Sequence, residues 1–117
     1  MDSIKALLVL PDEKPRLIEI ENTNEGIQKL IGGYYQALTV TGLEECMLLC
    51  DEDGKMKHRD PNFIFWCDLI VGPVLFVGLN ELGDGFGDVP GTYVDTLTEL
   101  VKVWRVSMNL RRERETL

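Results

Sequence analysis

Histidine and cysteine, the residues that most often build metal and catalytic sites, are scarce in this sequence. One histidine, His58, and three cysteines, Cys46, Cys50 and Cys67, occur among 117 residues. The cysteines have neither the even count of a disulfide framework nor the Cys-x-x-Cys spacing of a zinc site, so we expect reduced, mostly buried thiols. With a single histidine, a structural zinc site would need ligands from another subunit. We therefore expect no metal and no cofactor.

Long apolar runs are lacking as well. The longest apolar segment, residues 69–79, is interrupted by Gly72, Pro73 and Gly78 and falls short of the roughly 18 residues that a membrane span requires. The amino terminus has no basic segment followed by an apolar one, as a secretory signal would have. These absences predict a cytoplasmic protein.

Basic residues are outnumbered by acidic ones, 12 to 20, which gives a formal net charge of −8. This charge argues against direct binding to nucleic acids, because nonspecific affinity depends on Lys and Arg that neutralise phosphates. The charge is uneven, since residues 1–54 and 67–104 carry −7 and −5, whereas residues 55–66 and 105–117 each carry +2. Two basic islands thus stand in an acidic protein.

The length and the hydrophobic pattern predict one domain over residues 1–110, followed by a basic carboxyl-terminal tail, residues 111–117, that frays. Apolar or alternating segments predict strands over residues 4–10, 16–21, 34–40, 45–50, 55–59 and 74–79. An N-cap among Asn22, Thr23 and Asn24 and the pair Gly32-Gly33 predict a short helix over residues 25–31.

A second, longer helix is predicted near the carboxyl end. Apolar residues recur there at intervals of three and four, at Val94, Leu97, Val101, Trp104 and Met108. This spacing predicts a helix of about sixteen residues that covers one face of the sheet. It should begin with a capping box at Thr92 and Asp95. The expected fold class is α+β, with a small, mostly antiparallel sheet of about five strands packed by one short and one long carboxyl-terminal helix.

Three connections are predicted from their composition. Residues 51–54, Asp-Glu-Asp-Gly, predict a hairpin turn. A calcium loop is excluded there, because the glycine stands fourth instead of sixth. Residues 60–68 predict a short helical turn after Pro61, and the glycine-rich residues 83–91 predict a loop.

Six parts of the chain also occur in a distinctive order: residues 4–11, 16–20, 27–34, 50–55, Asn62 and residues 70–78. In this order they resemble the domain of unknown function 3846 family, over roughly residues 4–90. The resemblance implies a protein encoded by a phage or a mobile element, with an accessory role in phage–host conflict or in the biology of the element. It implies the host cytoplasm as the location, and it brings no activity with it.

The main candidate site lies in the first basic island, where residues 55–59 carry its three cations. In a strand, Lys55, Lys57 and Arg59 would share one face, with Met56 and His58 on the other. Asn62, Phe63, Phe65 and Trp66 follow directly. Cations that hold phosphates beside rings that stack on a base are the parts of a nucleotide pocket. The alternative is a hairpin that exposes its lysines while the aromatic rings fill the core.

Two further segments raise the same question. Tyr34 and Tyr35 follow a glycine pair, and a loop with glycines at positions 83, 85 and 87 could cradle an anion or simply connect two elements, with Phe86 anchored in the core. The predicted ligand-binding residues are therefore Lys55, Lys57, His58, Arg59, Asn62, Phe65, Trp66, Tyr34, Tyr35 and Phe86.

No catalytic constellation is evident, because nucleophilic catalysis needs a base beside a Cys or Ser and none can be named. We therefore expect no enzyme. Our hypothesis is an accessory protein that binds and sequesters a small anionic ligand, in particular a nucleotide immune signal, as a homo-oligomer. The alternative is an acidic, DNA-mimic-like inhibitor that binds a host nucleic-acid-binding protein.

Overall fold

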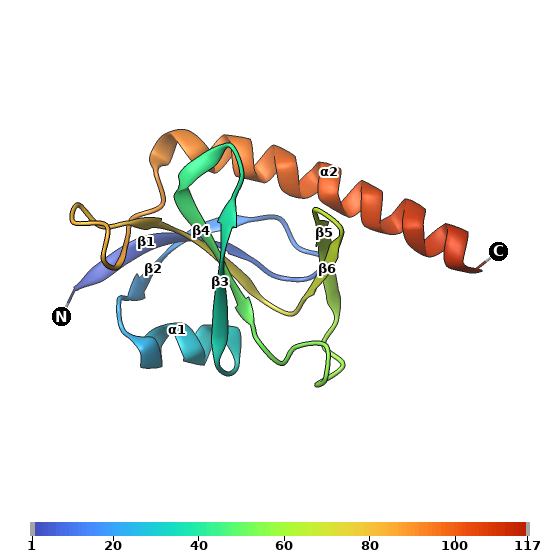
Figure 1. The fold of residues 1–117 in the computed structure, drawn as a ribbon, viewed down its shortest axis with the longest axis horizontal. Coiled ribbons are helices and arrows are strands. Elements are labelled where there is room, and N and C mark those ends of the chain that lie inside the picture. Colours follow the sequence, from blue (N-terminus) through green and yellow to red (C-terminus); the bar gives the residue numbers. More distant parts are fainter. Residues whose placement is uncertain (1, 117) are drawn as a thin grey trace.

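A six-stranded antiparallel sheet runs through the middle of the protein and separates its two helices (Figure 1). The computed structural model describes residues 2–116. The elements are, in chain order, β1 (Ser3–Val9), β2 (Arg16–Glu21), α1 (Asn24–Ile31), β3 (Tyr35–Val40), β4 (Leu43–Asp51), β5 (Pro61–Phe65), β6 (Asp68–Val71), β7 (Val74–Leu79), β8 (Phe86–Gly87) and α2 (Gly91–Thr116). The main strand order is β2-β1-β7-β4-β3, with β8 paired to β7, and β5 and β6 form a separate two-stranded sheet. The predicted α+β fold class is confirmed.

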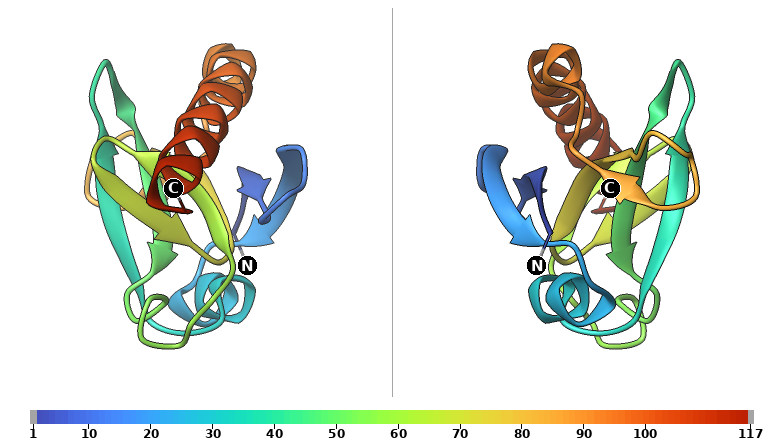
Figure 2. Two further views of the ribbon diagram at one scale, coloured as in Figure 1. Left: turned by 90° about the vertical axis from the view of Figure 1, so that its right-hand side faces the viewer. Right: turned by 90° about the vertical axis from the view of Figure 1, so that its left-hand side faces the viewer.

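Strand β7 lies at the centre of the sheet because its side chains are apolar on both faces. Val74, Leu75, Phe76 and Val77 are all fully buried. Alternate residues of a strand point to opposite faces. Val74 and Phe76 accordingly join the core under α2, whereas Leu75 and Val77 join the core under α1. The two helices therefore cover opposite faces of the sheet (Figure 2).

The amino-terminal hairpin and the short helix form as predicted. β1 pairs with β2 in antiparallel register, and α1 follows directly. The hydroxyl of Thr23 caps α1 by accepting a hydrogen bond from the amide of Gly26 at 3.0 Å. The helix ends at Gly32, whose φ of 90° lies in the left-handed region that glycine adopts without strain.

The segment after β4 differs from the prediction, because residues 52–58 form turns and no strand. Its amides bond locally: the amide of Lys57 donates to the carbonyl of Asp53, and that of Arg59 to the carbonyl of Gly54. His58, with a φ of 55°, reverses the chain direction. The predicted tight turn over residues 51–54 is present, since the amide of Gly54 donates to the carbonyl of Asp51 at 3.3 Å. The predicted strand over residues 55–59, and with it the hairpin, is wrong.

Gly54 is needed in these turns because it lacks a side chain. A Cβ at this position would lie 2.8 Å from the Cγ2 atom of Val71, and Gly54 is buried. Here glycine is needed because there is no room for a side chain.

Residues 60–68 do not form the helical turn that was predicted after Pro61. They contain β5 and the turn into β6, which together make an antiparallel hairpin. Aromatic and β-branched residues favour such a strand. The ring of Trp104 in α2 packs on this hairpin, with ring centroids 5.2 Å from Phe63 and 5.4 Å from Phe65. The aromatic segment therefore attaches α2 to the body of the protein.

Helix α2 is longer than predicted, at 26 residues instead of about sixteen. It begins at Gly91, so that Thr92 lies inside the helix and is not its N-cap. Residues 111–116, which were assigned to a basic tail, form its last turns, and residue 117 lies outside the described residues. The predicted apolar stripe does face the sheet: Leu97, Val101 and Met108 are buried, and Val94 and Trp104 are half-buried. Neither helix, as far as the structure describes them, is long and apolar enough to cross a membrane.

The positions of the three thiols give a test of this fold. Cys46 and Cys50 are buried, whereas Cys67 is exposed in the turn between β5 and β6. Burial raises the pKa of Cys46 to about 12 and raises the pKa of Cys50 as well. We expect one thiol to react rapidly with an aromatic disulfide reagent at neutral pH, and the other two only after unfolding in urea. A Cys67→Ser variant should not react while folded. Rapid reaction of two thiols in the native protein would contradict this arrangement.

Candidate functional site

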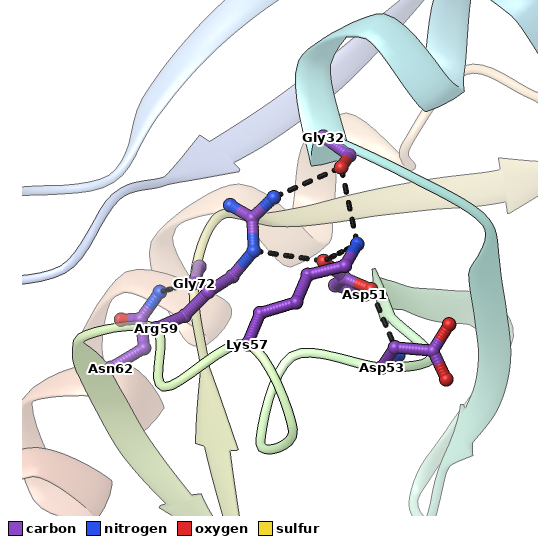
Figure 3. A network of polar contacts seen from close by, with 7 residues as sticks. All are labelled: Gly32, Asp51, Asp53, Lys57, Arg59, Asn62 and Gly72. Atoms are coloured by element: carbon purple, nitrogen blue, oxygen red, sulfur yellow. Dashed lines mark hydrogen bonds and ion pairs between the residues drawn. The ribbon is translucent and has the colours of Figure 1, made fainter.

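A buried carboxylate at the end of β4, that of Asp51, organises the segment that the sequence singled out. Its side chain is fully buried, and two cations approach it: the Nζ of Lys57 lies 3.0 Å from its Oδ2, and the Nε of Arg59 lies 2.8 Å from the same oxygen (Figure 3). The amide of Asp53 donates to the other oxygen, Oδ1, at 2.9 Å. The Nε of Arg59 forms an ion pair with Asp51, but its geometry does not make a hydrogen bond.

The same two cations also bind the carboxyl end of α1. Arg59 Nη2 donates to the carbonyl oxygen of Gly32 at 3.0 Å, and Lys57 Nζ donates to it at 3.3 Å. Cations are favoured at this position because the carboxyl end of a helix carries partial negative charge. We call the set of Gly32, Asp51, Lys57 and Arg59 the Asp51 network.

The glycines at the end of α1 are needed for this approach. A Cβ on Gly32 would lie 2.1 Å from the Nη2 of Arg59, and one on Gly33 would lie 2.5 Å from the Nζ of Lys57. Gly72, which precedes β7, would similarly place a Cβ 2.7 Å from the Cδ of Arg59. Three glycines therefore make room for two cationic side chains.

The ionisation of Asp51 follows from this environment. Burial alone would raise its pKa, but the hydrogen bond from Lys57, the amide of Asp53 and the charges of Lys57 and Arg59 together hold the pKa below its usual value. The carboxylate is thus charged at neutral pH. The side chains of Lys57 and Arg59 are 41% and 25% exposed, but their cationic ends contact Asp51 and the carbonyl of Gly32. An anionic ligand would have to compete with these internal contacts.

Asn62, another predicted ligand-binding residue, is also part of the interior. Its side chain is almost completely buried, and its Nδ2 donates to the carbonyls of Val9 and Gly72, both at 2.9 Å. Its Oδ1 accepts a hydrogen bond from the Nη2 of Arg105 at 2.8 Å. Asn62 therefore joins β1, β5, the turn before β7 and α2.

Arg105 was not singled out by the sequence analysis. Besides Asn62, it donates to the carbonyls of Leu10, at 2.7 Å, and Glu13. Burial lowers its pKa, and the negative charge of Asp12 partly offsets this. One feature of the sequence could have pointed to Arg105: it stands four residues after Val101, at the border of the apolar stripe of α2.

The remaining predicted residues are dispersed. Lys55 pairs with Asp68 and, with it, lines a small hollow that Asp51 also borders, but no ion pair joins Lys55 to Asp51 among the described residues. Phe65 packs in the core, and Trp66 is exposed in the turn that follows. His58, with Arg59, lines a hollow of about 350 Å³ beside Pro73, and Tyr34 is 70% exposed. The basic island thus does not present its three cations on one face.

Tyr35 and Phe86, in contrast, do come together. Their ring centroids lie 6.2 Å apart, and the hydroxyl of Tyr35 donates to the Oδ1 of Asn24 at 2.7 Å. This pair stands beside the amino end of α1, at a cleft of about 550 Å³ that we call the α1 cleft. Its lining residues are Asn22, Thr23, Asn24, Ile27, Leu79, Asn80, Gly83, Asp84, Gly85 and Phe86.

The glycine-rich loop forms one wall of the α1 cleft and is held by Asn80. The amide of Gly83 donates to the carbonyl oxygen of Asn80, and the amide of Asp84 donates to the Oδ1 of Asn80. The Nδ2 of Asn80 in turn donates to the Oδ1 of Asp84. These two amides are therefore not free to cradle an anion. The carboxylate of Asp84 adds a negative charge to the wall.

Two side-chain amides, those of Asn22 and Asn24, also line the α1 cleft, and each makes one hydrogen bond within the protein. The Nδ2 of Asn22 donates to the carbonyl of Phe86 at 3.1 Å, and the Oδ1 of Asn24 accepts from Tyr35. Each amide commits one end to these bonds, which leaves the Oδ1 of Asn22 and the Nδ2 of Asn24 to a ligand. The cleft can thus offer an acceptor, a donor and an aromatic edge to one bound molecule.

Comparisons with known proteins give one finding. A family model described as a domain of unknown function, DUF3846, matches residues 4–102 of the chain. No curated protein and no solved structure matches it. The segments around Gly32, Asp51, Asn62 and Gly72, on which the resemblance was noted, all contribute to the Asp51 network or to the contacts of Asn62. In this chain these segments therefore take part in internal contacts.

The charge state of Asp51 predicts a specific dependence of stability on pH. Because its pKa is lower in the folded than in the unfolded chain, it contributes stability above the unfolded value of about 3.9, and this is lost as the pH falls through the folded pKa. We expect Asp51→Asn to lower the free energy of unfolding at pH 7 by about 2–3 kcal/mol, since it leaves two cations without their buried partner. The difference in the free energy of unfolding between Asp51→Asn and the wild type should become smaller below about pH 4.

Urea denaturation at several pH values measures this difference, and Asp53→Asn is the matched control. The Asp53 side chain is exposed, so this substitution should change the stability by at most about 0.5 kcal/mol. Equal stability of wild type and Asp51→Asn from pH 7 to pH 3 would show that the buried ion pairs contribute nothing.

Proposed function

Since the chain belongs to the domain of unknown function 3846 family, which brings no activity with it, we propose that it is a non-catalytic binding protein whose site is the α1 cleft. The ligand is the base and sugar of a small nucleotide. In the cytoplasm of a phage-infected host, the protein would remove a nucleotide immune signal from the defence system. This last part of the proposal extends the role that the family resemblance implies.

The observation that carries the proposal is the combination of lining groups at the α1 cleft. A nucleobase is a flat ring with hydrogen-bond donors and acceptors on its edge, and the amides of Asn22 and Asn24 offer the complementary pair. Phe86, Ile27 and Leu79 supply apolar surface for the ring. The volume of about 550 Å³ lies within the range of small-molecule sites.

The charges of the cleft indicate how a nucleotide would lie. Asp84 lines it and no basic side chain does, so the phosphates of a bound nucleotide would point out of the cleft into solvent. Lys57 and Arg59 cannot hold them without leaving Asp51. The proposal therefore differs from the initial hypothesis: it retains the ligand class and moves the site away from the basic island.

The state of two thiols agrees with a binding role. Cys46 and Cys50 are buried with raised pKa values, which makes them poor nucleophiles. Cys67 is exposed in the turn between β5 and β6, outside the residues that line the α1 cleft.

The internal contacts of three cationic side chains favour a second candidate function, that of an acidic inhibitor that mimics DNA. Lys57, Arg59 and Arg105 bind groups of the protein itself, so the outward surface is more acidic than the balance of basic and acidic residues suggests. Such a surface could occupy the basic site of a host nucleic-acid-binding protein.

Isothermal titration against nucleosides, cyclic nucleotides and ADP-ribose derivatives tests the ligand proposal. We expect one compound to bind with a Kd below about 10 μM, and Asn24→Ala to weaken it by about tenfold through loss of one polar contact. Asn109→Ala, at an exposed asparagine of α2, and Lys55→Ala are the controls and should leave the affinity unchanged.

Two results would overturn the proposal. One is that no compound binds with a Kd below about 10 μM, while a pull-down recovers a host protein in stoichiometric amount. If the affinity of that host protein also falls steeply with salt, the result would support the inhibitor instead. The other is that binding occurs but is lost with Lys55→Ala and retained with Asn24→Ala, which would place the site at the basic island.

A further inference from the structure

Helix α2 carries a second apolar stripe on the side that faces away from the sheet. Val103, Val106 and Leu110 are 59%, 58% and 56% exposed, and the half-buried Leu100 continues the row toward the amino end. Their spacing of three and four residues aligns them along one face, as in a helix that pairs with another helix. We call Leu100, Val103, Val106 and Leu110 the outer stripe.

No element among the described residues covers the outer stripe. α2 is 26 residues, or roughly 39 Å, in length, and its carboxyl-terminal part extends past the strands (Figure 1). Single exposed apolar residues are ordinary on a protein surface, but a continuous row on one helix face indicates a contact surface.

The charges beside the outer stripe differ at its two ends. Asp95 and Glu99 flank a shallow hollow of about 430 Å³ at the amino end, whose floor includes Leu100. Arg114 follows Leu110 by about one turn at the carboxyl end, whereas Arg111 pairs with Glu115 and lines a hollow beside Ile64 and Leu69. An acidic hollow lined in part by Leu100 at one end thus matches an apolar side chain followed by a cation at the other.

From this self-complementarity we propose that a second copy of the chain docks antiparallel on the outer stripe, forming a twofold-symmetric dimer through α2. With Val103 opposite Val106 of the second copy, Leu110 of the copy lies at the hollow beside Leu100 and its Arg114 lies opposite Asp95. Each contact occurs twice, once on either side of the axis.

The alternative pairings are less favourable. In a parallel pair, Asp95 would lie beside its own equivalent and Arg114 beside its own, so that like charges meet at both ends. Antiparallel pairing brings opposite charges together at both ends. The charge pattern therefore selects a second copy in one orientation as the occupant of this face.

The contact is modest in size, because one helix contributes it. An interface below about 1,200 Å² belongs to the weak class, so we expect a Kd in the range of about 1–100 μM. The dimer should form at high protein concentration and dissociate on dilution.

Sedimentation velocity between about 1 μM and 1 mM tests the dimer. We expect a concentration-dependent shift from monomer to dimer for the wild type, and at least a tenfold increase in Kd for Val103→Glu/Val106→Glu. Asn109→Glu, on an exposed position of the same helix outside the outer stripe, is the matched control and should dimerise like the wild type. Circular dichroism confirms that each variant is folded.

Charge reversal tests the orientation. Asp95→Lys alone and Arg114→Glu alone should each weaken the antiparallel dimer, and the double variant should restore it, because each new lysine meets a new glutamate of the second copy. A protein that stays monomeric at 1 mM would overturn the proposal, as would a dimer that the Val103→Glu/Val106→Glu variant leaves unchanged. Failure of the double variant to restore an affinity that the single reversals reduced would overturn the antiparallel orientation.

Discussion

A carboxylate out of reach of water has to be neutralised by cations or protonated, and Asp51 meets this requirement by drawing Lys57 and Arg59 inward. Because the same cations bind the carbonyl of Gly32, one charged cluster ties together the end of β4, the turns after it and the end of α1. The glycines at positions 32 and 33 follow from this interaction, since side chains there would displace the two cations.

The two ends of α1 consequently have different roles. At its carboxyl end the Asp51 network uses the basic side chains for internal support, so an anion would have to compete with a buried carboxylate. At its amino end, polar groups that are only partly bonded border an open cleft. The helix is held by charge at its carboxyl end, and the site proposed above lies at its amino end and relies on hydrogen-bonding groups.

Elements with local signals could be predicted from the sequence. The apolar residues of β7, the cap at Thr23 and the spacing of Leu97, Val101 and Trp104 each report on neighbours within a few positions. The segment over residues 55–59 could not be predicted in this way, because its alternation fits a strand while its partners lie far along the chain: Lys57 and Arg59 bind Gly32, 25 and 27 positions earlier. The residues that line the α1 cleft could not be grouped from the sequence for the same reason. Phe86 and Asn22 meet across 64 positions, and only the pairing of the strands brings them together.

The central claim is that Arg59 supports the fold through Asp51 and is not held in reserve for a ligand. A double-mutant cycle with Asp51→Asn, Arg59→Met and the double variant, measured by urea denaturation at pH 7, tests it most directly. The account predicts a coupling free energy between the two side chains of more than about 1 kcal/mol, because Asp51→Asn removes the anion beside Arg59 and Arg59→Met removes one of the two cations beside Asp51. Additivity of the two changes to within about 0.5 kcal/mol would contradict it.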